Sequence, residues 1–214
     1  MEIFDISRAL SEGLAPWPGD TPFQYKLKSQ IAEGATVNIG AIGMSVHNGT
    51  HADAPFHFAS DGVPIDALRL ETYVGPAVVA DLAGNYRSDA MPQIRIGDLS
   101  EWSDELKTAP RLLLKTNVWL DSRVFPTRIP TIAPDVPAWW QERGVKLLGF
   151  DVPSVDEITA KNLVNHHALA AAGINIIESL DLRSVSAGCY NVSALPVKIA
   201  GADGAPVRAV LWRD

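Results

Sequence analysis

The chain has 214 residues, 47% of them hydrophobic and 20% charged, a balance that is typical of a globular protein with an apolar core and excludes the disordered and fibrous classes. Asp and Glu outnumber Lys and Arg by 25 to 18, for a formal net charge of -7, and the sequence has no basic stripe, so we expect no nucleic-acid partner. No apolar run approaches the ~20 residues of a membrane-spanning helix, so we expect a soluble protein with no membrane partner.

Proline and glycine divide the chain into short segments, and more of these segments have strand patterns than helix patterns. Phe23, Tyr25 and Leu27 alternate with polar residues, which predicts a half-buried, antiparallel strand. Further strands are predicted at 3–6, 37–46, 74–82, 111–116, 145–150, 174–178, 190–199 and 207–212, and helices at 96–106, 134–143 and 165–172. Strands alternate with helices only in the second half. We therefore predict an α/β fold with a mixed sheet, as one domain over residues 1–214.

Several common catalytic motifs are missing from the sequence. It contains no GxSxG elbow and no glycine-rich phosphate loop, and we interpret Gly201 and Gly204 in IAGADGAP as a turn between two strands. Cys189 is the only cysteine, so no internal disulfide can form, and packing in a strand fits it better than nucleophilic chemistry. Glu2 and Asp5 lie where a signal peptide would need positive charge, so we expect a cytoplasmic protein.

Three of the five histidines and one aspartate lie within eleven residues in HNGTHADAPFHF, residues 47–58. Gly49 and Pro55 argue against a helix here, whereas an extended chain would project residues 47, 51, 53 and 57 to the same side. Imidazole and carboxylate are ligands that zinc prefers, and a carboxylate can bridge two ions. The segment therefore predicts a metal site; the alternative is a solvated polar loop.

The other two histidines, His166 and His167, open the last predicted helix, and Glu178 ends the apolar run INIIE. Adjacent helical residues point about 100° apart, so only one of the two histidines can face a given site. A buried carboxylate at the end of such a run needs a cation or a donor to offset its desolvation. By itself Glu178 fits an exposed strand end; together with the first cluster it favours a second half-site of His plus Glu.

Trp17 lies in the proline-rich turn APWPGDTP, with no regular element to pack on. The sequence leaves two interpretations open: a lid or stacking surface for an aromatic ligand, or an aromatic plug over the core.

The segment HNGTHADAPFHF resembles the HxGTHxDxPxHF signature of the metal-dependent cyclase-like hydrolases, a family that includes bacterial kynurenine formamidases and isatin hydrolases. The resemblance to the formamidase branch continues through WPGDTPF (17–23), GFDVPSVD (149–156), HHALAAAGINIIESL (166–180) and ALPVKIAGADGAPVRAVL (194–211). One departure, DVPSVDE where relatives often have a proline after the second aspartate, concerns a loop rather than a ligand. The resemblance implies a swivelling β/β/α-type mixed-sheet fold and a homodimer.

The resemblance also implies residue roles. His47, His51 and Asp53 would hold one metal ion, and Asp53, His166 and Glu178 a second. His57 would be the catalytic acid/base. The family spacing selects His166 over His167, and Trp17 corresponds to a substrate contact.

These observations predict an amidohydrolase, an arylformamidase, that converts N-formyl-L-kynurenine to L-kynurenine and formate in tryptophan catabolism. The amide class follows from the metal and His57 chemistry, and the aryl formamide substrate from the resemblance. We expect two divalent ions per chain, with Zn²⁺ favoured and Mn²⁺ open. The alternatives are an isatin hydrolase or other cyclic amide or lactone hydrolase, and a non-catalytic protein with a single structural or sensing ion. A histidine outside the ligand set, His57, argues against the last.

Overall fold

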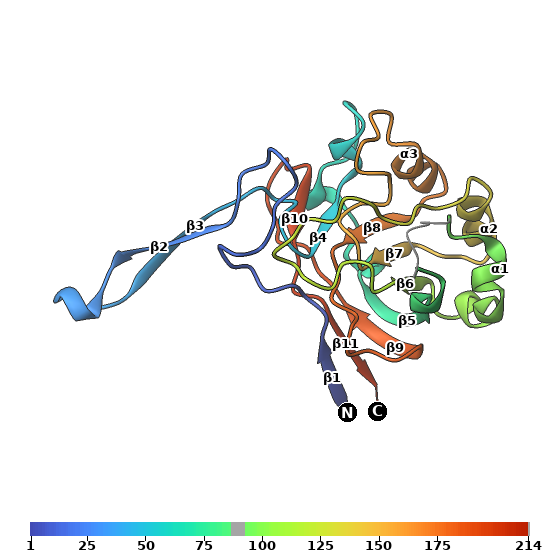
Figure 1. Cartoon of the computed structure of the whole chain (residues 1–214), viewed down its shortest axis with the longest axis horizontal. Coiled ribbons are helices and arrows are strands. Elements are labelled where there is room, and N and C mark those ends of the chain that lie inside the picture. The colour runs from blue at the N-terminus through green and yellow to red at the C-terminus, as the bar shows by residue number, and fades with distance from the viewer. Residues whose placement is uncertain (87–92, 214) are drawn as a thin grey trace.

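The computed structural model describes residues 1–86 and 93–213 (Figure 1). Within them, a nine-stranded sheet has the order β1-β11-β9-β5-β6-β7-β8-β4-β10, and β2 and β3 form a separate two-stranded sheet. The strands of the large sheet are β1 (Glu2–Asp5), β4 (His51–Asp53), β5 (Val74–Asp81), β6 (Arg111–Lys115), β7 (Leu147–Phe150), β8 (Asn175–Glu178), β9 (Gly188–Ser193), β10 (Gly204–Pro206) and β11 (Val210–Arg213).

The centre of this sheet is parallel and its edges are antiparallel. β5, β6, β7 and β8 pair in parallel, whereas β1, β11, β9, β4 and β10 pair antiparallel to their neighbours. Every residue of β6 (RLLLK) and β7 (LLGF) is buried, and their apolar runs LLL and LLGF are typical of strands covered on both faces. The mixed α/β fold expected from the sequence is thus confirmed.

Helices cover one face of the central strands (Figure 1): α1 (Ile96–Leu99), α2 (Val136–Glu142) and α3 (Val164–Ala171). Leu99, Trp140 and Leu169 from these helices are fully buried in one cluster with Leu112 and Phe150 of the sheet. Burial of such side chains contributes roughly 1.5 to 3 kcal/mol each. This layer holds α3 against β8, where two predicted site segments meet.

A second core lies on the other face, where the sheet curls. Ala52 of β4 and Ala205 of β10 share a buried cluster with Ile6 and Leu211, which come from the opposite edge of the sheet. An isolated bridge between Ser7 and Leu180 and a hydrogen bond from Asp181 N to Ile6 O (2.9 Å) connect the chain after the edge strand β1 to the chain after β8. The curl brings the chain after β1 beside the end of β8.

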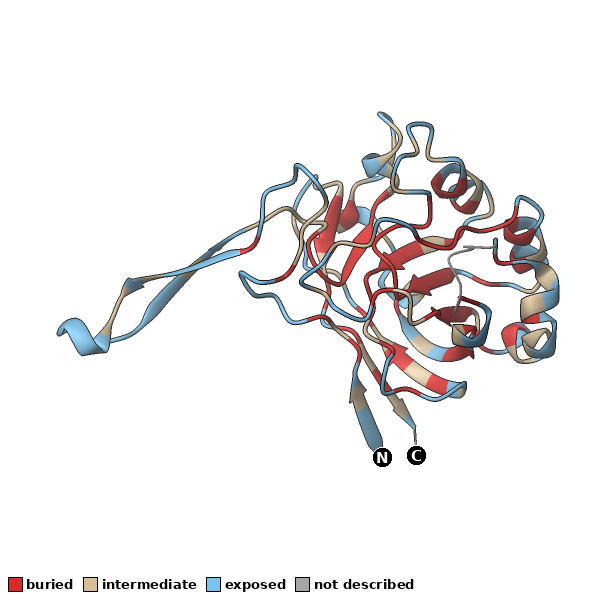
Figure 2. Ribbon diagram, in the orientation of Figure 1, coloured by how far each residue is buried: buried red, intermediate tan, exposed pale blue. Residues whose placement is uncertain are grey.

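The hairpin of β2 (Gln24–Ser29) and β3 (Ile39–Gly43) projects away from the rest of the chain (Figure 1) and is exposed along most of its length (Figure 2). The antiparallel pairing predicted for this segment is confirmed. The prediction that this strand is half-buried is wrong, because the hairpin projects away from both cores and leaves Tyr25 exposed.

Three further predictions need correction. The helix predicted at 96–106 is α1 followed by two 3-10 turns, and Ser100 Oγ donates to Gly97 O within it, a local bond that competes with a continuous helix. The strand predicted at 190–199 ends at Ser193. Gly201 does adopt a turn conformation, with φ of 71°, but Gly204 begins β10, a strand too short to show periodicity in the sequence.

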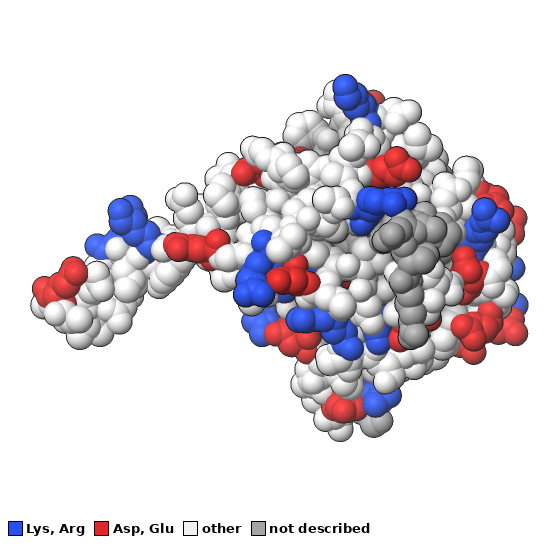
Figure 3. Space-filling model, viewed as in Figure 1, with Lys and Arg blue, Asp and Glu red and all other residues white. Residues whose placement is uncertain are grey.

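Basic and acidic side chains are interspersed over the face shown in Figure 3. Across residues 1–86 and 93–213, the helices are too short or too polar to cross a bilayer.

Candidate metal and catalytic site

The candidate site is centred on β4, between β8 and β10. His51 and Asp53 are two residues apart on this strand, so their side chains project to the same face. His51 is the register partner of Glu178 on β8, and Asp53 is the partner of Gly204 on β10. Strand pairing therefore brings Glu178 to the histidine cluster across the sheet.

His51 lies close to two buried carboxylates, those of Asp53 and Glu178. His51 Nε2 lies 3.3 Å from Asp53 Oδ1 and 3.6 Å from Glu178 Oε2. The other nitrogen of the ring, Nδ1, is 2.9 Å from Gly49 O and donates its proton there. This bond orients the ring so that Nε2 is directed at the carboxylates, as in a metal-binding histidine.

His166 approaches the same carboxylates from the first turn of α3. Its Nε2 lies 3.5 Å from Asp53 Oδ2 and 3.6 Å from Glu178 Oε1. Its Nδ1 is 2.7 Å from Asp156 Oδ2, and Asp156 also accepts the backbone N–H groups of Asn165 and His166. His167 is exposed and packs against Phe58. Of the two adjacent histidines, only His166 reaches the centre.

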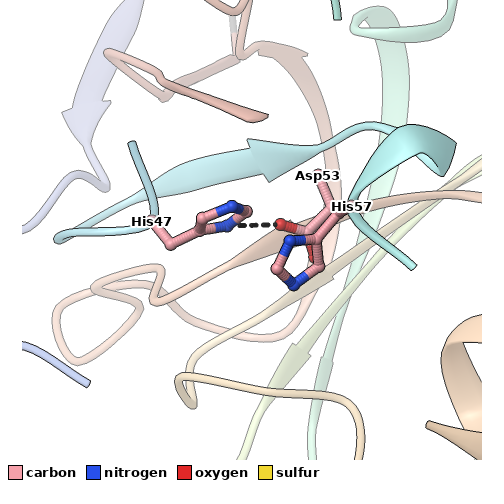
Figure 4. Close-up of side chains that lie close together, drawn as sticks. All are labelled: His47, Asp53 and His57. Carbon is pink, nitrogen blue, oxygen red and sulfur yellow. Dashed lines mark hydrogen bonds and ion pairs between the residues drawn. The ribbon is translucent and has the colours of Figure 1, made fainter. Parts of the chain in front are cut away.

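His47 and His57 complete the cluster without lying on a strand. His47 lies in the turn before β4, and His57 ends a 3-10 turn, Pro55–His57; the expected extended geometry is thus wrong at both positions, because Gly49 and Pro55 bend the chain. Figure 4 shows both rings close to Asp53, with the contact between His47 Nδ1 and Asp53 Oδ1 (3.0 Å) drawn as a dashed line. The ring centroids of His47 and His57 are 4.1 Å apart.

Charges in this cluster strongly perturb the pKa values. Burial and the Asp53 charge hold the pKa of Glu178 well above its usual range. Burial alone would raise the pKa of Asp53, but the imidazoles of His166, His47 and His51 hold it well below that of an ordinary aspartate. Burial alone would lower the pKa of His47 and His166, yet their carboxylate partners raise these pKa values to about 9 and about 10. The cluster therefore favours bound positive charge.

A divalent cation fits this donor set. Asp53 Oδ2 is buried, and among the described residues no donor hydrogen-bonds to it, a costly state for a carboxylate oxygen. Two groups have ligand atoms within 4.8 Å of one another: His51, Asp53 and Glu178, and His47, Asp53 and His57. Imidazole nitrogens and carboxylate oxygens are the ligands that zinc prefers. The second group includes His57, so geometry alone leaves this histidine open as a ligand or as an acid/base.

A cavity of about 280 Å³ lies at the cluster and is lined by His47, His51, His57, His166 and Glu178. The aromatic side chains of Trp17, Trp119 and Phe125 also line this cavity. Trp17 packs edge to face on Phe125, with ring centroids 5.3 Å apart, and Phe125 packs in the same way on Trp119 at 5.9 Å. The structure places Trp17 in the wall of the cavity rather than over the core.

Four residues of this environment were not singled out in the sequence: Asp156, Asp203, Trp119 and Phe125. Asp156 lies in the segment GFDVPSVD, where a carboxylate just before a histidine-bearing helix is a signal for a histidine-orienting group. Asp203 lies in a segment interpreted as a turn. Trp119 and Phe125 lie outside the predicted elements, so no sequence signal connects them to Trp17.

Comparisons with known proteins agree with the geometry. The sequence model of the Cyclase family matches residues 4–157. A kynurenine formamidase of Geobacillus thermodenitrificans is 44% identical over 207 residues, which cover 97% of this chain and 95% of its own. The structure of a potential metal-dependent hydrolase with cyclase activity is 25% identical with a TM-score of 0.79, covering 98% of this chain and 96% of its own.

Isatin hydrolase A from Labrenzia aggregata has the same fold, with a TM-score of 0.83 at 23% identity and coverage of 98% of this chain and 93% of its own. The resemblance noted in the sequence is confirmed over nearly the full length, and this chain belongs to the Cyclase family and is a hydrolase.

Proposed function

We propose that this chain is a metal-dependent arylformamidase that hydrolyses N-formyl-L-kynurenine to L-kynurenine and formate. The observation that carries the proposal is the His and carboxylate cluster at the base of an aromatic-walled cavity. Its support from relatives is the 44% identity to a kynurenine formamidase over nearly the whole of both chains.

In this proposal His47, His51 and Asp53 would hold one divalent ion, and Asp53, His166 and Glu178 would hold the second. Zn²⁺ is the favoured ion and Mn²⁺ the alternative, because both accept imidazole and carboxylate ligands. When bound, such ions polarise a carbonyl oxygen and lower the pKa of water. The anchored nitrogens of His51 and His166 support this assignment, since each ring already presents its second nitrogen to the carboxylates.

His57 acts as the acid/base in the proposed reaction. Its ring lines the cavity, and burial lowers the pKa of His57 below that of an ordinary imidazole although the Asp53 charge partly offsets this. A neutral His57 can accept a proton from the water that adds to the formyl carbon. It then returns that proton to the aryl amine nitrogen as the C–N bond breaks, and formate is released.

Trp17 supplies the aryl contact. The indole is held by Phe125, so a flat ring can pack on it with little loss of side-chain freedom.

The proposal also includes the assembly and location of the protein. We propose that residues 1–214 form a single domain, that the chain forms a homodimer, and that it is located in the cytoplasm. The projecting hairpin supports the homodimer, because Tyr25, Ile31, Ile39 and Ile42 are exposed on it and apolar side chains grouped in this way suit an interface. Sedimentation equilibrium of the wild-type chain and of Ile42→Lys tests this; a monomeric wild-type chain would contradict it.

The deciding experiment is a hydrolysis assay of the purified chain with N-formyl-L-kynurenine and isatin side by side, before and after treatment with a chelator. We expect formamide hydrolysis that the chelator abolishes and added Zn²⁺ or Mn²⁺ restores. Faster hydrolysis of isatin would favour the alternative that the isatin hydrolase fold suggests. Binding of metal with no hydrolysis of either compound would favour a non-catalytic metal-binding protein.

A further inference from the structure

Asp203 contacts two histidines of the candidate site from a segment that carries none of the assigned residues. Its Oδ2 lies 2.9 Å from His47 Nε2 and 3.5 Å from His57 Nδ1. Asp203 is therefore the meeting point of an assigned metal ligand and the assigned acid/base.

The backbone holds this carboxylate in place. Asp203 O accepts the N–H of Ala54 at 2.9 Å, directly beside β4, and the next residue, Gly204, pairs with Asp53. A Cβ on Gly204 would lie 2.8 Å from His47 Cε1 and 3.0 Å from Ala52 O, so only glycine allows the His47 ring to pack this closely.

The two nitrogens of His47 have different partners. Nδ1 is 3.0 Å from Asp53 Oδ1, inside the cluster, while Nε2 is 2.9 Å from Asp203 Oδ2, outside it. A carboxylate that accepts one imidazole N–H fixes the tautomer and directs the other nitrogen to a metal. His51 and His166 follow the same pattern through Gly49 O and Asp156.

We propose that Asp203 is a positioning residue that holds His47 with Nδ1 directed into the metal cluster and orients the His57 ring through its Nδ1. This inference rests on the proposed function for the His57 part. The 3.5 Å separation at His57 suits a contact that tightens during the reaction, since catalytic hydrogen bonds are often long in the free enzyme. The 2.9 Å contact at His47 is already formed.

Asp203→Asn tests both parts, because the amide keeps the size of the side chain and removes its charge. Asp66→Asn is the matched control: Asp66 Oδ1 accepts the N–H of Gly201 at 2.9 Å and so anchors the same loop without contacting a site histidine. The measurements are zinc affinity of the full chain by competition with a chromophoric chelator, and kcat and KM for N-formyl-L-kynurenine at saturating zinc.

We expect Asp203→Asn to weaken zinc binding by about 10- to 100-fold, the usual effect of removing a group that orients a metal ligand. At saturating zinc it should lower kcat and leave KM nearly unchanged, and Asp66→Asn should leave zinc affinity and kcat at wild-type values. Wild-type zinc affinity in Asp203→Asn overturns the role at His47, and a wild-type kcat overturns the role at His57. Equal losses in Asp66→Asn would mean that the loop fold is responsible, which also overturns the proposal.

If the wild-type chain binds zinc but does not hydrolyse the formamide, the proposed function fails. The zinc affinity of Asp203→Asn then still decides the role at His47.

Discussion

Replacing Trp17 by alanine should weaken the binding of an aryl formamide more than it slows the chemistry. The indole forms one face of the cavity and packs edge to face on Phe125. Phe125 in turn packs on Trp119, which is buried, donates from Nε1 to Val124 O and lies under the Arg8 guanidinium at 4.0 Å. The rest of the wall therefore remains in place when the indole is removed.

The expected magnitude follows from the contact that is lost. An aromatic pair contributes about 0.5 to 1.5 kcal/mol beyond the burial of its area, which corresponds to about 2-fold to about 12-fold in KM at about 1.4 kcal/mol per factor of ten. Loss of apolar contact on the indole face adds to this, so a rise of several-fold to tens-fold is expected. kcat should change less, since the stacked ring is the same in the ground state and the transition state.

The assay is steady-state hydrolysis of N-formyl-L-kynurenine and of an aliphatic formamide by wild type, Trp17→Ala and Trp17→Phe. Trp139→Ala removes a half-buried indole of α2 that stacks on Arg143 (3.8 Å) and does not line the cavity, so it controls for general destabilisation. The aliphatic compound should be a poor substrate throughout. An unchanged KM in Trp17→Ala, or equal hydrolysis of aryl and aliphatic formamides by the wild type, would refute the stacking argument.

Four further predictions concern the metal centre and the surface. His57→Ala should retain its metal and lose about 10²- to 10⁴-fold in rate, as for a positioned acid/base, whereas His51→Ala should lose metal; equal metal loss in both would make His57 a ligand. His167→Ala should be nearly silent and His166→Ala metal-poor, because only His166 faces Glu178, and the opposite result would reverse the assignment. Elemental analysis should find close to two ions per chain, and full activity at one ion would contradict a binuclear centre. The hydrogen bond from Arg183 lowers the pKa of Asp181 below 3.8, so this pair stabilises the fold above that pH and the stabilisation is lost as the pH falls through the lower pKa of the folded state. Asp181→Asn should therefore lower the free energy of unfolding by at most about 1 kcal/mol at pH 7. Denaturant unfolding should show that this difference from wild type shrinks below about pH 4.

Local patterns in the sequence were enough to predict the mixed α/β fold and the segments that supply the site. The two-residue spacing of His51 and Asp53 predicts their common face because the side chains of a strand alternate, and β4 shows that face. The alternation of strands with helices in the second half likewise predicts a mixed sheet, and the structure shows that β5, β6, β7 and β8 form its parallel centre. The hairpin of β2 and β3 shows the limit of such patterns: its alternation predicts a strand, but only the surrounding structure determines whether a core covers it.

The tertiary structure decided which of these segments meet. Pairing of β4 with β8 brings Glu178 opposite His51, and the docking of α3 turns His166 inward and His167 outward. Pairing of β4 with β10 brings in Asp203, although a three-residue strand is too short to leave a periodic pattern. Contacts between residues far apart in the chain depend on how the sheet curls and how the helices pack, and local periodicity carries no information about either. The histidines and carboxylates of the cluster could therefore be named from the sequence, but the contact of Asp203 with two of those histidines could not.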